Sequence, residues 1–197
     1  MSSSRISRRS FLHLIPVAAL AAPSSLVALR GPGGELLTGP ALQEADRHGF
    51  AGPFTPEEEA AVAASPMAQA IARLHGRGYN CAEMILLAAI QAKGLREDHL
   101  DAASVFGGGI ARGDLCGFLT GGLMAIGFVA ARKTQDRAVR VRISRQASDA
   151  YWDWWVSKGD VHCPGPLESH PTPELFLRMS QRTAAKLEEV LDAMVAT

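Results

Sequence analysis

The chain has 197 residues, 47% of them hydrophobic and 20% charged, so it can form one globular domain with a hydrophobic core, and wholesale disorder is excluded. Basic and acidic residues both number 20, and without a basic excess the chain lacks the usual footprint of a nucleic-acid-binding protein. Arg5, Arg8 and Arg9 lie in a leading stretch that has no acids. The rest of the chain has 17 basic and 20 acidic residues and is mildly acidic.

The first 22 residues have the pattern of an export signal. A polar, basic stretch precedes an apolar run from Leu12 to Ala22, which is too short to span a membrane. Ser7 to Leu12 reads S-R-R-S-F-L and resembles the twin-arginine consensus, with His13 where lysine is common. The alternative is an ordinary secretory signal or an uncleaved anchor with two adjacent arginines. We therefore expect residues 1–22 to engage the twin-arginine translocase and to direct the protein to the periplasm or otherwise out of the cytoplasm, where cysteines meet oxidising conditions.

Residues 23–54 are rich in glycine, proline and alanine, which predicts a flexible linker. A helical, cysteine-containing domain is expected over residues 55–197. Its first helix should begin after Thr55, because Pro56 and Glu58 complete the pattern of a capped helix start.

Two further helices follow on the same kind of evidence. One is expected between Pro66 and Gly76, which ends it. The next should be capped by Asn80, with Glu83 three residues on, and its run as far as Ile90 is apolar on every side. A helix with that pattern is expected to be central and buried.

The middle of the chain predicts a short helix over residues 97–104, a flexible corner at the glycines 107–109, and a long apolar helix over residues 115–131 capped by Asp114. This last segment is the one candidate for a membrane span. It is short for that role and has a G-x-x-x-G spacing from Gly117, so a core helix that packs closely on a neighbour is the preferred interpretation.

The last third of the chain predicts two more helices. Residues 139–143 alternate like a strand, but helical spacing over residues 136–155 is longer and should prevail. Basic residues near its start are expected to form a solvated face: Arg132, Lys133, Arg137, Arg140, Arg142 and Arg145. After a loop, Thr172 and Pro173 start the final helix. No strand is expected, and the predicted fold is an all-α, compact multi-helix bundle with two buried apolar helices.

The cysteines are the residues most indicative of chemistry. There are three, Cys81, Cys116 and Cys163, and each lies at the boundary of an expected element. Cys81 and Cys116 are expected in first helical turns, where the helix dipole favours a thiolate and lowers the pKa. Cys163 follows His162 on a loop. The simpler alternative is that small thiols fill a core.

Cys116 is expected to be the most reactive of the three. The glycines at 107–109 and Gly113 leave the backbone around it open, and Arg112 adds positive charge nearby. Cys81 has Glu83 in the same turn, which opposes ionisation.

Three motifs, taken in order, resemble the C-GCAxxG-C-C family of redox-active proteins. They are the segment Tyr79–Glu83, the triple glycine after Phe106, and the C-G-F-L-T-G run that starts at Cys116. Members are small helical proteins with four characteristic cysteines, named redox-active by inference, and a relative, the split-Soret cytochrome c, carries haem and an iron–sulfur site. Here Cys163 matches the third cysteine. Phe118 replaces the usual alanine, and no fourth cysteine occurs in the final helix.

The first functional hypothesis is an exported thiol redox protein. Cys81 and Cys116 would form a reversible disulfide, and Cys163 would resolve it or contact a redox partner. The second is a carrier of a metal ion or iron–sulfur cluster held by Cys81, Cys116, Cys163 and His162. The third is a disulfide-stabilised scaffold that docks on a membrane transporter or redox complex.

Motif searches add little to these hypotheses. The chain has no C-x-x-C, C-x-x-C-H, H-E-x-x-H, P-loop or G-x-S-x-G pattern, so covalent haem attachment and the commonest hydrolase sites receive no support. Whether the protein is an enzyme, which substrate it takes and its oligomeric state stay open.

Overall fold

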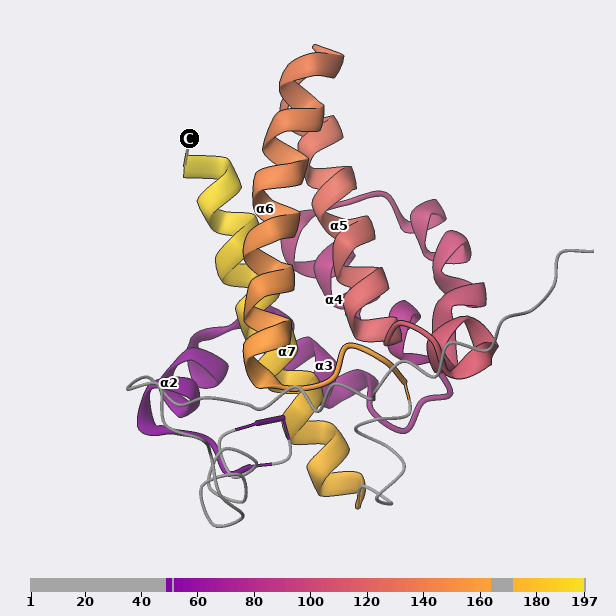
Figure 1. Cartoon of the computed structure of the whole chain (residues 1–197), viewed down its shortest axis with the longest axis vertical. Coiled ribbons are helices and arrows are strands. Elements are labelled where there is room, and N and C mark those ends of the chain that lie inside the picture. Colours follow the sequence, from indigo (N-terminus) through magenta and orange to yellow (C-terminus); the bar gives the residue numbers. More distant parts are fainter. Residues whose placement is uncertain (1–48, 51, 164–171, 197) are drawn as a thin grey trace, which may run out of the picture. The chain divides into compact units, whose positions relative to one another are not determined.

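The computed structural model describes residues 49–50, 52–163 and 172–196 of the chain. Their element order is α2 (Pro56–Ala64), α3 (Pro66–Leu74), α4 (Cys81–Lys93), the 3-10 helix η1 (Glu97–Phe106), the turn η2 (Gly109–Gly113), α5 (Gly117–Lys133), α6 (Arg137–Lys158) and α7 (Pro173–Ala196) (Figure 1). The all-α prediction is confirmed: within the described ranges, the only β-type pairing is an isolated bridge between Leu115 and His162. The expected signal peptide and most of the linker lie outside the described residues.

Both predicted capping boxes are present. The Thr55 hydroxyl accepts a hydrogen bond from the Glu58 amide at 3.2 Å, and the Glu58 carboxylate accepts one from the Thr55 amide at 3.1 Å. Asn80 and Glu83 repeat this reciprocal arrangement at the start of α4, with distances of 3.0 and 2.9 Å. Because each cap satisfies amides that have no partner within the helix, these helix starts are set by local sequence.

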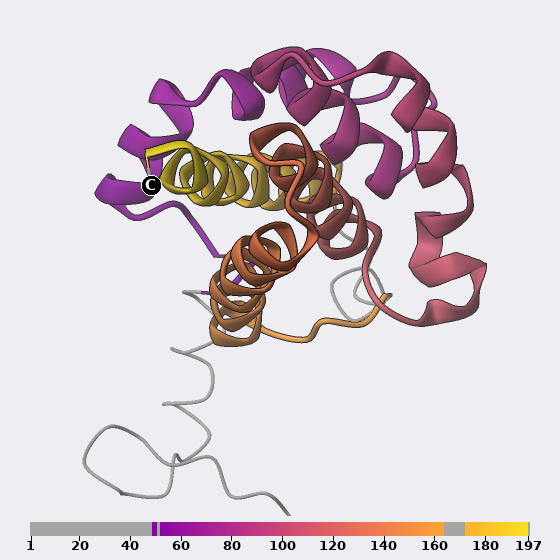
Figure 2. The same cartoon turned by 90° about the horizontal axis from the view of Figure 1, so that it is seen from above.

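The core is formed around α4, α5 and α7. In α4 the consecutive residues Met84, Ile85 and Leu86 are all buried, so this helix is covered on every side as predicted. α5 packs on α4, and α7 contacts α2, α3, α4, α5 and α6, so that it runs through the middle of the bundle (Figure 2). Across the described ranges, no helix is both long and apolar enough to cross a membrane.

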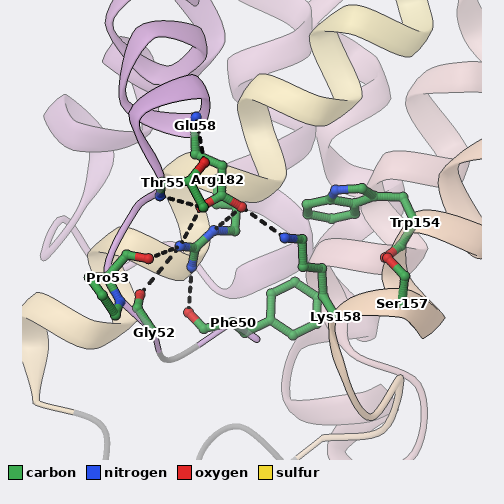
Figure 3. A network of polar contacts seen from close by, with 9 residues as sticks. All are labelled: Phe50, Gly52, Pro53, Thr55, Glu58, Trp154, Ser157, Lys158 and Arg182. Carbon is green, nitrogen blue, oxygen red and sulfur yellow. Dashed lines mark hydrogen bonds and ion pairs between the residues drawn. The ribbon is translucent and has the colours of Figure 1, made fainter. Parts of the chain in front are cut away.

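The last part of the expected linker is packed into the fold. Phe50 is only 5% exposed, and its ring lies 4.3 Å from that of Trp155. Arg182 of α7 donates hydrogen bonds to the backbone carbonyls of Phe50, Gly52 and Pro53 (Figure 3). The packed part of the chain therefore includes residues on the linker side of the boundary expected at residue 55.

The same arginine forms an ion pair with Glu58, which Lys158 of α6 also contacts at 2.9 Å (Figure 3). Burial is the largest single effect and opposes the ionisation of Glu58, but the hydrogen bonds from Arg182, Lys158 and the Thr55 amide together with the charge of Arg182 outweigh it and lower the pKa to about 2. This network joins α2, α6, α7 and the incoming chain.

The start of α5 differs from the prediction. Asp114 does not cap the helix; α5 begins at Gly117, with Cys116 at the N-cap position, and continues to Lys133. The reason is a long-range backbone pairing, because the Leu115–His162 bridge and its flanking hydrogen bonds pair residues 114–116 with residues 161–163. The helix predicted over residues 136–155 is confirmed as α6, with Asp136 as its cap.

Candidate functional site

The cysteines lie on three segments that meet at one end of the α4–α5 pair. Cys81 is the first residue of α4, Cys116 precedes the first residue of α5, and Cys163 lies on the segment that follows α6. Ionised Cys81 and Cys163 would each raise the pKa of Cys116, and Cys163 also raises that of Cys81. Such mutual electrostatic effects require close approach, so the three thiols form one cluster, here called the thiol cluster. All three are free.

Two glycines of α5 allow the close approach of α4. A Cβ atom added at Gly117 would lie 2.9 Å from the Cβ of Cys81 and 2.9 Å from the amide nitrogen of Ala82. One added at Gly121 would lie 2.6 Å from the carbonyl oxygen of Ala82. These distances leave no room for a side chain. The close packing predicted from the G-x-x-x-G spacing is thus confirmed, and it brings Cys81 against the start of α5.

The Leu115–His162 bridge positions the third cysteine. The Cys116 amide donates to the Val161 carbonyl at 2.8 Å, and the Cys163 amide donates to the Asp114 carbonyl at 2.7 Å. Side chains alternate between the two faces of such a pairing. Cys116 and Cys163, each one residue from the bridged pair, therefore share a face.

The triple glycine forms a defined turn rather than the flexible corner expected from sequence. Gly108, Gly109, Ile110 and Ala111 all have φ between 52° and 61°, a left-handed conformation that is a genuine outlier for a β-branched residue such as Ile110. A Cβ atom at Gly107 would lie 2.5 Å from that of Asn80, so the turn rests directly on the cap of α4. A hydrogen bond from the Gly108 amide favours the thiolate of Cys81.

Burial reverses the expected acidity of the thiols. Cys116 is 2% exposed, and desolvation, with Cys81 beside it, raises its pKa to about 12, even though the Phe118 and Leu119 amides favour the thiolate. Desolvation likewise raises the pKa of Cys81 to about 11 and that of Cys163 above its ordinary value. The prediction of lowered pKa values for Cys81 and Cys116 is therefore wrong, because the helix N-terminus compensates only part of the desolvation cost of a buried anion.

Exposure also distinguishes the three thiols. Cys116 and Cys163 are buried, whereas Cys81 is half-buried. An incoming reagent can therefore reach Cys81 most readily. This argues against the expectation that Cys116 reacts first.

The expected metal ligands are not arranged as a binding site. Within the described ranges, no group of three or more His, Cys, Asp and Glu side chains could hold a metal ion. His162 is exposed, and its Nδ1 lies 2.7 Å from Oδ1 of Asp160 rather than among the sulfurs. The carrier hypothesis therefore gains no support from the geometry.

Sequence reasoning missed one residue beside the thiol cluster. Tyr151 is fully buried, and its hydroxyl donates to the Phe118 carbonyl at 3.1 Å, in the first turn of α5. Burial and the neighbouring Cys116 raise its pKa far above the ordinary value. A side chain at Gly122 would collide with the tyrosine ring. The signal was present, because Tyr151 lies midway between Ala147 and Trp155 on the buried face of α6.

Comparison with known proteins identifies one family. The model of the family described as "Putative redox-active protein (C_GCAxxG_C_C)" matches residues 79–189, a segment that contains the three cysteines, the triple glycine and the close-packing glycines of α5. No curated protein and no solved structure matches the chain.

Proposed function

The chain belongs to the C_GCAxxG_C_C family of redox-active proteins, and on that premise we propose that its thiol cluster carries out reversible thiol–disulfide exchange outside the cytoplasm. The observation that carries the proposal is the convergence of Cys81, Cys116 and Cys163, from segments far apart in sequence, at one end of the α4–α5 pair. A core that merely needed small side chains would not require three thiols near enough to affect one another's pKa values.

In the proposed reaction Cys81 attacks first, because it is the most exposed of the three. Its thiolate attacks one sulfur of a partner disulfide; the partner S–S bond breaks, a mixed disulfide forms, and one partner thiolate leaves. Cys116 then attacks the sulfur of Cys81, closes the internal disulfide and releases the second partner thiolate. Two electrons pass to the partner, and the two protons of the protein thiols protonate its thiolates.

The raised pKa values of Cys81 and Cys116 determine how fast this dithiol pair reacts and how reducing it is. A thiol with a pKa of about 11 is ionised in only about one molecule in 10⁴ at pH 7. Attack is therefore expected to be slow unless a bound partner supplies positive charge. Because no thiolate is stabilised in the reduced state, the couple is expected to be reducing rather than oxidising.

Export by the twin-arginine translocase is part of the proposal. Its support is the S-R-R-S-F-L sequence at Ser7–Leu12 and the apolar run that follows. Thiol–disulfide exchange is useful in an oxidising compartment, where disulfides of partner proteins persist. The partner proposed here is accordingly a protein that carries a disulfide.

The test is a thiol count in defined redox buffers. The chain has three cysteines in all, so full-length protein reduced and then equilibrated with oxidised glutathione should retain one free thiol, with Cys81–Cys116 identified by mass spectrometry. Cys163→Ser should still form this disulfide and retain no free thiol. Cys81→Ser and Cys116→Ser should not form it.

Two results would overturn the proposal. One is three free thiols at every glutathione ratio in protein shown to be folded. The other is glutathione bound stably to Cys163 alone, with no internal disulfide in any variant.

A further inference from the structure

A groove unrelated to the thiol cluster runs between α5 and α6. It encloses about 730 Å³ and is lined on the α5 side by Met124, Phe128 and Ala131 and on the α6 side by Arg140, Val141 and Arg145. The two helices run side by side toward the top of Figure 1, where α6 begins and α5 ends. The volume lies within the range of binding sites for compact ligands or for a few side chains of a partner.

The floor of the groove is an apolar row on α5 that is covered only in part, because the ring of His99 in η1 stacks on that of Phe128 with the ring centroids 3.8 Å apart. Met124, Phe128 and Ala131 follow the i, i+4, i+7 spacing of one helix face and are only partly buried. Gly127 lies in the same row, and a Cβ atom added there would meet nothing within 4 Å. Val141 faces it from α6 and is 46% exposed. Exposed apolar rows of this kind mark interaction surfaces more often than isolated exposed residues do.

The rim of the groove has an excess of positive charge, since Arg140 and Arg145 line it together with one acidic residue, Asp149. Four arginines lie within the first nine residues of α6: Arg137, Arg140, Arg142 and Arg145. In the part of the chain that the structure describes, none of the four forms an ion pair with a carboxylate. The nearest acid before them, Asp136, is engaged as the helix cap, and the next, Asp149, lines the groove one helical turn beyond Arg145.

We propose that this groove binds an acidic amphipathic helix of a partner protein. A helix places apolar side chains at i, i+3, i+4 and i+7, which matches the row on α5, and its acidic flanks would meet Arg140 and Arg145. The site is distinct from the thiol cluster and does not depend on its chemistry.

The test is binding of a fluorescent helical peptide to the full-length protein. The probe has leucine at i, i+3, i+4 and i+7 and glutamate on its flanks, and in the control peptide lysine replaces every glutamate. Fluorescence anisotropy should show binding of the glutamate peptide and at least tenfold weaker binding of the lysine peptide. Higher salt should weaken the binding, since the charges are exposed.

Three variants distinguish binding in the groove from non-specific electrostatic attraction to α6. Gly127→Leu fills open space in the groove, and the pair Arg140→Glu and Arg145→Glu reverses its rim; each should weaken binding at least tenfold. Arg142→Glu lies on the same helix but does not line the groove, and should weaken binding less than threefold. Circular dichroism checks that each variant is folded, and Cys81→Ser should bind as the unmodified protein does.

Several outcomes would overturn the proposal. They are the absence of binding by the glutamate peptide, an equal loss in Arg142→Glu, or unchanged binding in Gly127→Leu. Binding to phosphatidylglycerol vesicles without binding to the peptide would identify the surface as a membrane contact instead.

Discussion

Two regions of this molecule bury ionisable groups in opposite ways. At the junction of α2, α6 and α7, Glu58 is half-buried against two cationic partners, Arg182 and Lys158, and its pKa falls to about 2. At the end of the α4–α5 pair, half-buried Cys81 and buried Cys116 have no cationic partner, and desolvation raises their pKa values to about 11 and 12. The first region stabilises its charged form, and the second stabilises its neutral form.

The difference indicates what each region does. In the first region Glu58 and Arg182 form hydrogen bonds and ion pairs with each other and with neighbouring groups. The role of this network is to hold the chain before α2 against α7. The neutral thiols of the cluster stay free to form disulfides. Their positions are maintained by packing at Gly117 and Gly121, by the left-handed turn and by the backbone hydrogen bonds of the Leu115–His162 bridge. Substitutions around Glu58 should therefore change stability in acid, and substitutions in the thiol cluster should change stability in alkali and thiol reactivity.

The largest effect is expected from Arg182→Met. It leaves Glu58 with Lys158 alone and leaves the carbonyls of Phe50, Gly52 and Pro53 without their donor. Removing one partner of a buried pair should lower the free energy of unfolding by about 3 kcal/mol or more, as measured by urea denaturation. Lys186→Met, which removes a more exposed pair with Glu189, should cost less than about 0.5 kcal/mol. Similar losses in the two variants would contradict the assigned role of Arg182.

Acid should weaken the same region. The pKa of Glu58 in the folded protein, about 2, is below its ordinary value of 4.5, so its stabilisation is complete above pH 4.5 and is lost as the pH falls toward 2. The contribution lost is about 3 kcal/mol at most. Glu58→Gln should be less stable than the unmodified protein at pH 7. Its free energy of unfolding, measured by denaturation from pH 6 to pH 2, should also fall less as the pH is lowered. If Glu58→Gln loses as much stability between pH 6 and pH 2 as the unmodified protein does, other carboxyl groups are responsible for the acid sensitivity.

A methyl group between α4 and α5 should act on the thiol cluster. Gly121→Ala places a Cβ atom 2.6 Å from the Ala82 carbonyl, and overpacking of this kind costs about 1–3 kcal/mol. The matched control is Gly127→Ala in the same helix, where nothing lies within 4 Å; it should be neutral or stabilise by up to about 1 kcal/mol. Thermal unfolding of both variants measures the difference, and equal melting temperatures would show that close packing at Gly121 does not matter.

Alkali should give the smallest change, and the part that comes from the thiol cluster can be isolated by substitution. The raised pKa values of Cys81 and Cys116 mean that their neutral forms stabilise the fold fully below pH 9, their ordinary pKa. That contribution is lost as the pH rises toward 11–12, by about 1 kcal/mol per thiol at pH 10. The double variant Cys81→Ser and Cys116→Ser should lose less stability between pH 8 and pH 10 than the unmodified protein. A larger loss of stability in the double variant than in the unmodified protein would indicate that these thiols ionise readily in the folded state.

Local sequence predicted the features that local contacts determine. The caps at Thr55 and Asn80, the buried α4 and the close packing at Gly117 and Gly121 all follow from short-range patterns, and all are confirmed. Such patterns also identified the three cysteines and their family, but they could not show how deeply the thiols are buried.

The missed features depend on residues far apart in the chain. Asp114 has the pattern of a helix cap, yet its carbonyl pairs with the amide of Cys163, which moves the start of α5 to Gly117. Arg182 contacts Phe50 across 132 positions. The positive φ of Ile110 opposes its own conformational preference and is set by its surroundings. No single-sequence pattern encodes these pairings, because each needs the assembled bundle.

The most direct test of the thiol cluster is time-resolved alkylation of the reduced protein, read by mass spectrometry between pH 7 and pH 11. We expect Cys81 to be labelled first, at a rate that still rises at pH 10 because its pKa is about 11, and Cys116 to follow several-fold more slowly. Cys163 should be protected as well, since it is 3% exposed. Labelling of Cys116 or Cys163 before Cys81, or a rate for Cys81 that levels off below pH 8, would contradict the proposed site.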